Sequence, residues 1–168
     1  ISMKEDKLNY KLSYIRECIK KGDKPLNLLN MYNIKGFEND NVKIMIDPYL
    51  SDSVKKINPK NYRRVPVLKS LFDVKPDIMI FTHNHLDHYD PETVQMFVTN
   101  NTAITVLSPS SVWSEVRKTG GDNNYVLFNR NTSWTEYGIR FTAVKAEHSD
   151  PTPIGVIIDD GEKKYYVT

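Results

Sequence analysis

The sequence is nearly free of cysteine. Cys18 is the single one in 168 residues, which excludes a disulfide framework and a cysteine-based metal site. Because a lone thiol is typical of proteins in a reducing compartment, we expect a cytoplasmic protein. No apolar run approaches the roughly 18–20 residues that a membrane span requires. The first 21 residues also lack the continuous apolar centre of a secretory signal.

Neither sign of charge dominates the chain. It carries 23 Lys and Arg against 21 Asp and Glu, for a formal net charge of +2. This balance gives no electrostatic reason to invoke a nucleic acid or an anionic membrane. We therefore expect a small-molecule substrate, no membrane association and no nucleic-acid partner.

Histidine is scarce as well, and its placement is uneven. Of the four histidines, three fall within the stretch FTHNHLDHYD at 81–90, as His83, His85 and His88, with Asp87 between them. The stretch directly follows Ile78-Met79-Ile80-Phe81, a compact apolar run that predicts a buried strand. Side chains two residues apart project to the same side of an extended chain. Two histidines and the aspartate can therefore converge just past the strand's carboxyl end.

The rest of the chain alternates between strand and helix patterns. Short apolar runs bounded by turn residues predict strands near 26–34, 42–46, 78–81, 103–107, 125–128, 139–146, 154–158 and 163–167. An apolar stripe predicts a helix over 4–21, and prolines at positions 91 and 109 open two more. We expect an irregular loop over 51–66 and a short helix over 67–72. This mixture predicts an α/β fold with a mixed sheet, preceded by an N-terminal helix and linker at 1–25; the domain itself spans 26–168.

Imidazole nitrogen and carboxylate oxygen are ligands for zinc, manganese and iron. His83 and His85 pointing to one position, with Asp87 and His88 at a neighbouring one, would describe two metal ions close together. The remaining histidine, His148, follows the predicted strand 139–146 and can join the cluster. The plainer alternative is a solvated loop in which histidines cap turns.

The stretch Thr82-His83-Asn84-His85-Leu86-Asp87-His88 resembles the T-H-x-H-x-D-H signature of the metallo-β-lactamase-fold hydrolases. Two further stretches, DPYLSD at 47–52 and DPET at 90–93, are similar to the subgroup that contains L-ascorbate-6-phosphate lactonase. The resemblance extends from about residue 26 to the end of the chain. It implies a metallo-β-lactamase-like αβ/βα sandwich.

The resemblance also implies residue roles. Five residues would ligate two divalent ions, three at the first and two at the second: His83, His85 and His148, then Asp87 and His88. Asp87 would also be the catalytic residue. Asp47 would lie behind the metals and hold the signature loop. The resemblance assigns no substrate-binding residue.

The activity implied is that of a metal-dependent hydrolase that uses a metal-bound hydroxide on a lactone or sugar-phosphate-type ester. The ions would be zinc or manganese, or iron. A phosphodiesterase or nuclease of the same fold is an alternative, and so is a non-catalytic metal-binding module. Arg63-Arg64 could meet a substrate phosphate or form a solvated pair of loop charges.

In the family, the strand matching 163–167 leads into G-D-[ST], whose aspartate bridges both metals, and this sequence ends at Thr168. We therefore expect the N-terminal portion of a longer protein, which supplies mainly the first half of the sandwich. We expect at most one well-held metal ion and little hydrolysis from these residues alone. The face meant for the second sheet would be exposed and apolar, and an unprotected edge strand at 163–167 would favour a homo-oligomer.

Overall fold

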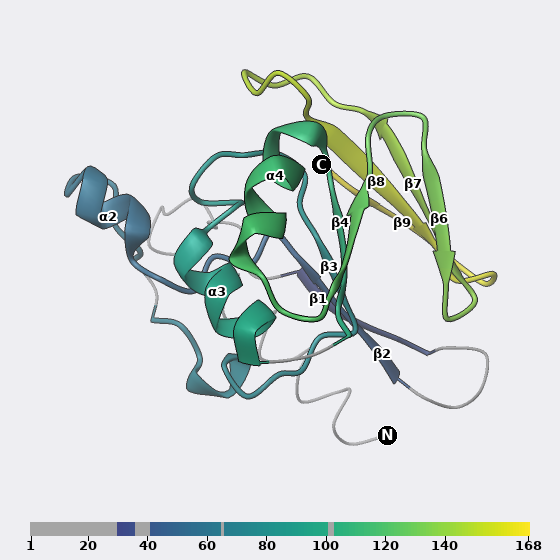
Figure 1. Ribbon diagram of the computed structural model, residues 1–168, viewed down its shortest axis with the longest axis horizontal. Helices are drawn as coiled ribbons and strands as arrows, with labels where there is room; N and C mark the ends of the chain where they lie inside the picture. The colour runs from purple at the N-terminus through teal and green to yellow at the C-terminus, as the bar shows by residue number, and fades with distance from the viewer. Residues whose placement is uncertain (1–29, 36–40, 65, 101–102) are drawn as a thin grey trace, which may run out of the picture.

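The computed structural model describes residues 30–35, 41–64, 66–100 and 103–168. The predicted N-terminal helix and linker at 1–25, Cys18 within it, and the first residues of the predicted strand 26–34 lie outside these ranges. The described chain forms two β-sheets with helices on one side, arranged in layers (Figure 1).

The first sheet has five strands in the order β1-β2-β3-β4-β5. They are β1 (Asn30–Lys35), β2 (Asn41–Ile46), β3 (Ile78–Ile80), β4 (Thr105–Ser108) and β5 (Asn124–Leu127). β1 is antiparallel to β2, and the other neighbours are parallel. β3 and β4 are buried along their whole length, as expected for parallel strands covered on both faces. The predicted α/β class with a mixed sheet is confirmed.

The second sheet is antiparallel, in the order β6-β7-β8-β9. It contains β6 (Ser133–Glu136), β7 (Ile139–Lys145), β8 (Ile154–Asp159) and β9 (Lys164–Val167). Along β7, buried residues alternate with more exposed ones, so one face of this sheet is apolar. β6 was not predicted, because its sequence Ser-Trp-Thr-Glu is short and largely polar; pairing with β7 makes it a strand.

The helices are short. They are α2 (Ser53–Ile57), η1 (Lys69–Leu71), α3 (Pro91–Asn100), α4 (Ser110–Val116) and η2 (Arg117–Thr119). The expected loop at 51–66 is therefore wrong in part, since it contains α2, and the expected helix at 67–72 is reduced to the single 3-10 turn η1. α3 and α4 cover the outer face of the first sheet (Figure 1). No helix in the described ranges is long and apolar enough to cross a membrane.

Two apolar cores separate the layers. One lies between the sheets, where Ile44, Ile80 and Leu107 of the first sheet pack with Phe141 and Val156 of the second. The other lies between the first sheet and the helices. The expectation of an exposed apolar face on the first sheet is therefore wrong, because β6–β9 already cover that face. β6 and β9 are the edge strands of the second sheet, and self-association through β9 stays a prediction.

Candidate metal centre

The histidine-rich loop lies at the carboxyl edge of the first sheet, where the two sheets meet. β3 ends at Ile80, whose carbonyl accepts a hydrogen bond from Asp47 N–H (2.9 Å) beyond the end of β2. Thr82 is buried, and its carbonyl accepts a hydrogen bond from Ile154 N–H (3.0 Å) at the start of β8. The loop is therefore tied to both sheets just before the histidines begin.

All four histidines of the sequence come together at this edge. The ring centroid of His83 lies 3.9 Å from that of His88, 4.1 Å from that of His148 and 5.0 Å from that of His85. The rings of His85 and His148 are 4.6 Å apart. One ligand atom from each of His83, His85 and His148 lies within 4.8 Å of the others. The first three predicted ligands therefore converge, although His83 and His148 are 65 positions apart in the sequence.

His83 is the buried member of the group, and its ring is held in one tautomer. The Thr82 hydroxyl donates to Asp47 Oδ2 (2.5 Å), so its oxygen is left to accept from Nδ1–H of His83 (2.9 Å). A neutral imidazole carries only one N–H, which leaves Nε2 as a lone pair. This Nε2 is buried, and no described residue offers it a hydrogen bond. Burial, together with the charges of the neighbouring histidines, lowers the pKa of His83 to about 4, so the ring is neutral at neutral pH.

Asp47 also orients His88. Its Oδ1 accepts from Thr82 N–H (2.7 Å), and its Oδ2 accepts from Nδ1 of His88 (2.9 Å). Burial lowers the pKa of His88, but the hydrogen bond and charge of Asp47, with the charge of Asp87, raise it above its ordinary value overall. A carboxylate that accepts from the far nitrogen of a histidine is the usual support of a histidine ligand.

Asp47, His83 and His88 also bring potential ligand atoms together. This second group is better explained as a hydrogen-bonded network than as a metal site. Asp47 Oδ2 already accepts from Thr82 and His88, and Nδ1 of His83 is bonded through the Thr82 hydroxyl.

Asp87 lies on the solvent side of His88. Its Oδ2 is 3.9 Å from Nε2 of His88, and about half of its side chain is exposed. The two residues therefore face a common point outside the loop, at the Nε2 end of the His88 ring. The described residues bring no third carboxylate or histidine to this point in a group of three.

His85 and His148 are exposed and held loosely. Ser149 Oγ lies 3.4 Å from Nε2 of His85, and Asp150 N–H lies 3.4 Å from Nδ1 of His148. Both distances are long for hydrogen bonds. The centre therefore has one fixed ring, that of His83, and two rings that can rotate toward it.

Asp150 joins the two loops that carry these rings, and sequence reasoning missed it. Its buried carboxylate accepts from Asn84 N–H (2.9 Å), between His83 and His85, and from Thr152 N–H (2.6 Å). Burial raises the pKa of Asp150, but the two backbone hydrogen bonds lower it below its ordinary value overall. Asp150 therefore fixes the position of the His148 loop relative to the signature loop.

The Asp-Pro dipeptide is a sequence signal that could have pointed to Asp150. The chain contains three, at Asp47, Asp90 and Asp150. Asp47 directly follows β2, Asp90 directly precedes α3, and Asp150 lies in the loop between β7 and β8. The buried Asp90 accepts from the Thr93 hydroxyl (2.5 Å) and from Ser51 N–H (3.3 Å). It thereby joins the loop after β2 to the start of α3.

The donor set fits a divalent metal ion. Two nitrogens that each lie about 2.1 Å from one zinc ion are at most about 4.2 Å apart. The atoms of His83, His85 and His148 lie within 4.8 Å, so small rotations of the two exposed rings close the difference. A buried imidazole nitrogen whose lone pair has no partner destabilises the folded protein, and a bound metal ion would supply that partner.

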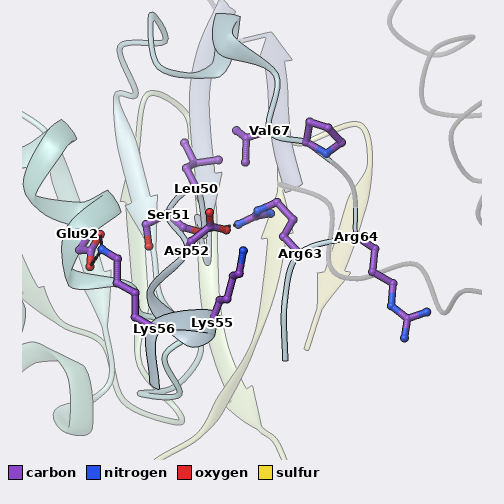
Figure 2. Close-up of a pocket in the computed structure, with 10 residues that line it drawn as sticks. Leu50, Ser51, Asp52, Lys55, Lys56, Arg63, Arg64, Val67 and Glu92 are labelled. Atoms are coloured by element: carbon purple, nitrogen blue, oxygen red, sulfur yellow. Dashed lines mark hydrogen bonds and ion pairs between the residues drawn. The ribbon is translucent and has the colours of Figure 1, made fainter. Parts of the chain in front are cut away.

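A separate pocket of about 570 Å³ lies beside α2, α3 and the loop after β2. Within it, Arg63 Nη2 donates to the carbonyls of Tyr49 (2.7 Å) and Ser51 (3.1 Å), and the guanidinium lies 4.4 Å from the centre of the Tyr49 ring. Figure 2 shows Arg63 pointing into the pocket and Arg64 pointing away from it. Arg63 thus fixes the loop after β2. A phosphate contact for Arg63 and Arg64 stays a prediction.

Comparison with known proteins identifies the family of the fold. The family described as the beta-lactamase superfamily domain matches residues 43–168. The metal-dependent hydrolase Ta0764 of Thermoplasma acidophilum, of the UPF0173 group, is 29% identical over 131 residues. That match covers 73% of this chain and 51% of Ta0764, so the chain spans about half the length of this relative.

Two other proteins are similar. The mitochondrial N-acyl-phosphatidylethanolamine-hydrolyzing phospholipase D of Saccharomyces cerevisiae is 31% identical over 98 residues, which are 56% of this chain and 19% of the yeast protein. The structure of Igni18, a metallo hydrolase from Ignicoccus hospitalis, aligns with a TM-score of 0.56 at 21% identity, over 83% of this chain and 59% of Igni18. From its family match and its fold, the chain belongs to the metallo-β-lactamase-fold superfamily.

Proposed function

We propose that the protein is a metal-dependent hydrolase in which His83, His85 and His148 hold a first divalent ion. The observation that carries this proposal is the buried Nε2 of His83, which has no other partner among the described residues and is kept unprotonated by its neighbours. Names of relatives such as Ta0764 support the hydrolase class.

Zinc and manganese are the ions that these donors favour, with iron as an alternative. Such an ion supplies Lewis acidity, which makes water acidic near neutral pH and polarises the bond that is hydrolysed. Asp87 and His88 are the donors we assign to a second ion, on the basis of their 3.9 Å separation. Two protein ligands hold an ion poorly, so we expect at most one tightly bound ion per 168-residue chain.

The protein's own groups have separate tasks in this proposal. Through the Thr82 hydroxyl and through its own bond to His88, Asp47 draws the N–H of each neutral ring to Nδ1, so that Nε2 is the nitrogen that faces an ion. Asp87, with its half-exposed carboxylate at the solvent side of the loop, accepts the proton of the attacking water. The described structure leaves the second site with two protein ligands, so we expect little hydrolysis from these residues alone.

For the substrate we propose a lactone or a sugar-phosphate-type ester. The two stretches that resemble the lactonase subgroup lie against each other. Leu50 N–H donates to Thr93 Oγ1 (2.8 Å), and Ser51 N–H donates to Asp90 Oδ2 (3.3 Å). This contact supports the assignment because both stretches then belong to one local structure beside the histidine loop.

A phosphodiester is the second candidate substrate. The observation that favours it is the likeness to the yeast protein, which is named as a phospholipase D. The same histidine cluster would serve both reactions, since an ion that polarises a carbonyl also polarises a phosphoryl oxygen. Comparing hydrolysis of a sugar lactone with hydrolysis of a phosphodiester by the same preparation separates the two.

Two further parts of the proposal depend on the sequence and the sheet edges. We place the protein in the cytoplasm because it has a single cysteine. We also propose that it self-associates, since β9 is an edge strand with backbone groups able to pair with another chain. Light scattering of the purified chain measures this, and a strict monomer at high concentration would exclude it.

The test of the metal site is the zinc or manganese content of the dialysed chain, measured by mass spectrometry. We expect about one ion per chain in the wild type and none in His83→Ala. Asn84→Ala is the matched control, because only the backbone N–H of Asn84 takes part in the loop contacts. If His83→Ala retains the ion, the proposed ligand set is wrong.

A further inference from the structure

Residues 53–72, here called the cationic strip, concentrate a charge that the whole-chain balance conceals. The strip has no Asp or Glu and carries six cations: Lys55, Lys56, Lys60, Arg63, Arg64 and Lys69. Six of the chain's 23 Lys and Arg lie here, so the rest of the chain carries 17 against 21 Asp and Glu. The net charge of +2 is therefore the difference between a strongly basic strip and an acidic remainder.

Large apolar side chains project from the same strip. Ile57 is 78% exposed, Tyr62 52%, Phe72 43% and Leu68 41%. They make up four of the eight large hydrophobic residues that are exposed in the described ranges. Exposed apolar side chains that gather in one segment are typical of a docking surface, whereas single ones scattered over a protein need no explanation.

The strip is fixed to the body, so these side chains are held outward. Val67 and Leu71 pack against the core beneath the helices, which leaves their neighbours Leu68 and Phe72 facing solvent. In the middle of the strip, Arg63 is bonded to two backbone carbonyls of the loop after β2. α2 stands out from the body of the molecule (Figure 1).

Cations gather beside the most exposed apolar residue. Lys55 and Arg63 both point into the pocket at the base of α2 (Figure 2). Lys56 pairs with Glu92 (2.6 Å) at the pocket wall. In the described part of the chain, Lys55 has no such ion-pair partner, and it lies two residues before Ile57.

We propose that the cationic strip docks the protein on the surface of an anionic lipid bilayer. Ile57, Leu68 and Phe72 enter the boundary between head groups and acyl chains, and the exposed lysines Lys55, Lys60 and Lys69 meet the lipid phosphates. Cations that flank exposed apolar side chains match the two layers of that boundary. A nucleic acid would use the cations but would leave the exposed aliphatic Ile57 and Leu68 in water, since its interfaces are more polar.

The test is co-sedimentation of the whole chain with vesicles of phosphatidylcholine, with and without phosphatidylserine. We expect binding only to the anionic vesicles, and weaker binding as salt is added. Replacing Lys55 and Lys60 together by Gln should lower the partition coefficient about 25-fold, since each cation near the surface contributes about fivefold. Ile57→Ser should lower it about tenfold.

Matched controls lie outside the strip. Tyr137→Ser removes a side chain that is 49% exposed, and Lys163→Gln removes an exposed cation; neither should change the partition. Circular dichroism shows that each variant is folded. Equal binding to neutral vesicles, or no binding to either kind, overturns the proposal. The proposal is also overturned if the chain binds a DNA duplex but not vesicles, and the strip variants abolish the DNA binding.

Discussion

Replacing Asp47 with asparagine tests whether this residue controls the tautomers of the histidine centre. Asparagine has the same shape and, like aspartate, tolerates the positive φ of 46° at this position. Its carbonyl oxygen can still accept from Thr82 N–H. Its amide group, however, is a donor where the second carboxylate oxygen accepts from the Thr82 hydroxyl and from His88.

The consequence follows along the hydrogen bonds. The amide donates to Thr82 Oγ1, so the hydroxyl proton turns toward Nδ1 of His83. The proton of the neutral His83 ring then resides on Nε2, the atom that should bind the ion. Losing such a supporting carboxylate typically costs 10–100-fold in metal affinity, which is about 1.4–2.7 kcal/mol. Exchanging charged for neutral hydrogen bonds should also lower the free energy of unfolding by about 2 kcal/mol.

Zinc titration calorimetry measures the affinity, and ¹⁵N spectra of labelled histidine report which ring nitrogen carries the proton. We expect Asp47→Asn to bind zinc at least tenfold more weakly, with the His83 proton moved from Nδ1 to Nε2. The exposed Asp73→Asn is the control and should bind as the wild type does. An Asp47→Asn protein with unchanged zinc affinity and unchanged tautomers would refute the reasoning.

Four further substitutions have definite expected outcomes. Asp87→Ala should leave the first ion and the fold intact but remove most of the small hydrolytic activity expected of these residues, measured by turnover of a lactone; turnover close to that of the wild type would exclude Asp87 from the mechanism. Asp150→Ala leaves two backbone donors without their acceptor, so urea denaturation should show a free energy of unfolding lower by about 2–4 kcal/mol. An unchanged denaturation midpoint would contradict the role of Asp150 in joining the two loops. Gly121→Ala should destabilise the fold by more than about 2 kcal/mol, because φ is 86° and the added Cβ would lie 2.7 Å from the Val98 carbonyl oxygen. Gly120→Ala meets open space but has φ 80° and ψ −161°, which essentially only glycine adopts, so it should cost about 1–3 kcal/mol of backbone strain and less than Gly121→Ala.

The sequence predicted the parts of the fold that local pattern determines. β3 was predicted from four apolar residues, and α3 from the Asp90-Pro91 start, because buried strands and proline-led helices carry short-range signals. β6 was missed because its residues are polar, and only the partner strand β7 makes it extended. The exposed face expected on the first sheet is covered, because β6–β9 pair into a second sheet that packs on it, and the sequence does not specify that pairing.

Some residues of the candidate centre could likewise be predicted from the sequence, and others could not. The spacing of His83 and His85 after a buried strand placed two of the rings, and the structure brings His148 to them across 65 positions of chain. The role of Asp150 could not be predicted, because its two bonds go to backbone N–H groups, which every residue except proline carries. The contact exists only once β8 pairs in the second sheet and brings this loop beside Asn84.

The most direct test of the central claim is the position of the zinc anomalous-scattering peak in crystals of the zinc-loaded chain. We expect one strong peak about 2.0–2.1 Å from Nε2 of His83, with nitrogens of His85 and His148 at the same distance. A peak at another place on the chain, or none at the histidine cluster, would contradict the assignment of these residues as the metal-binding centre.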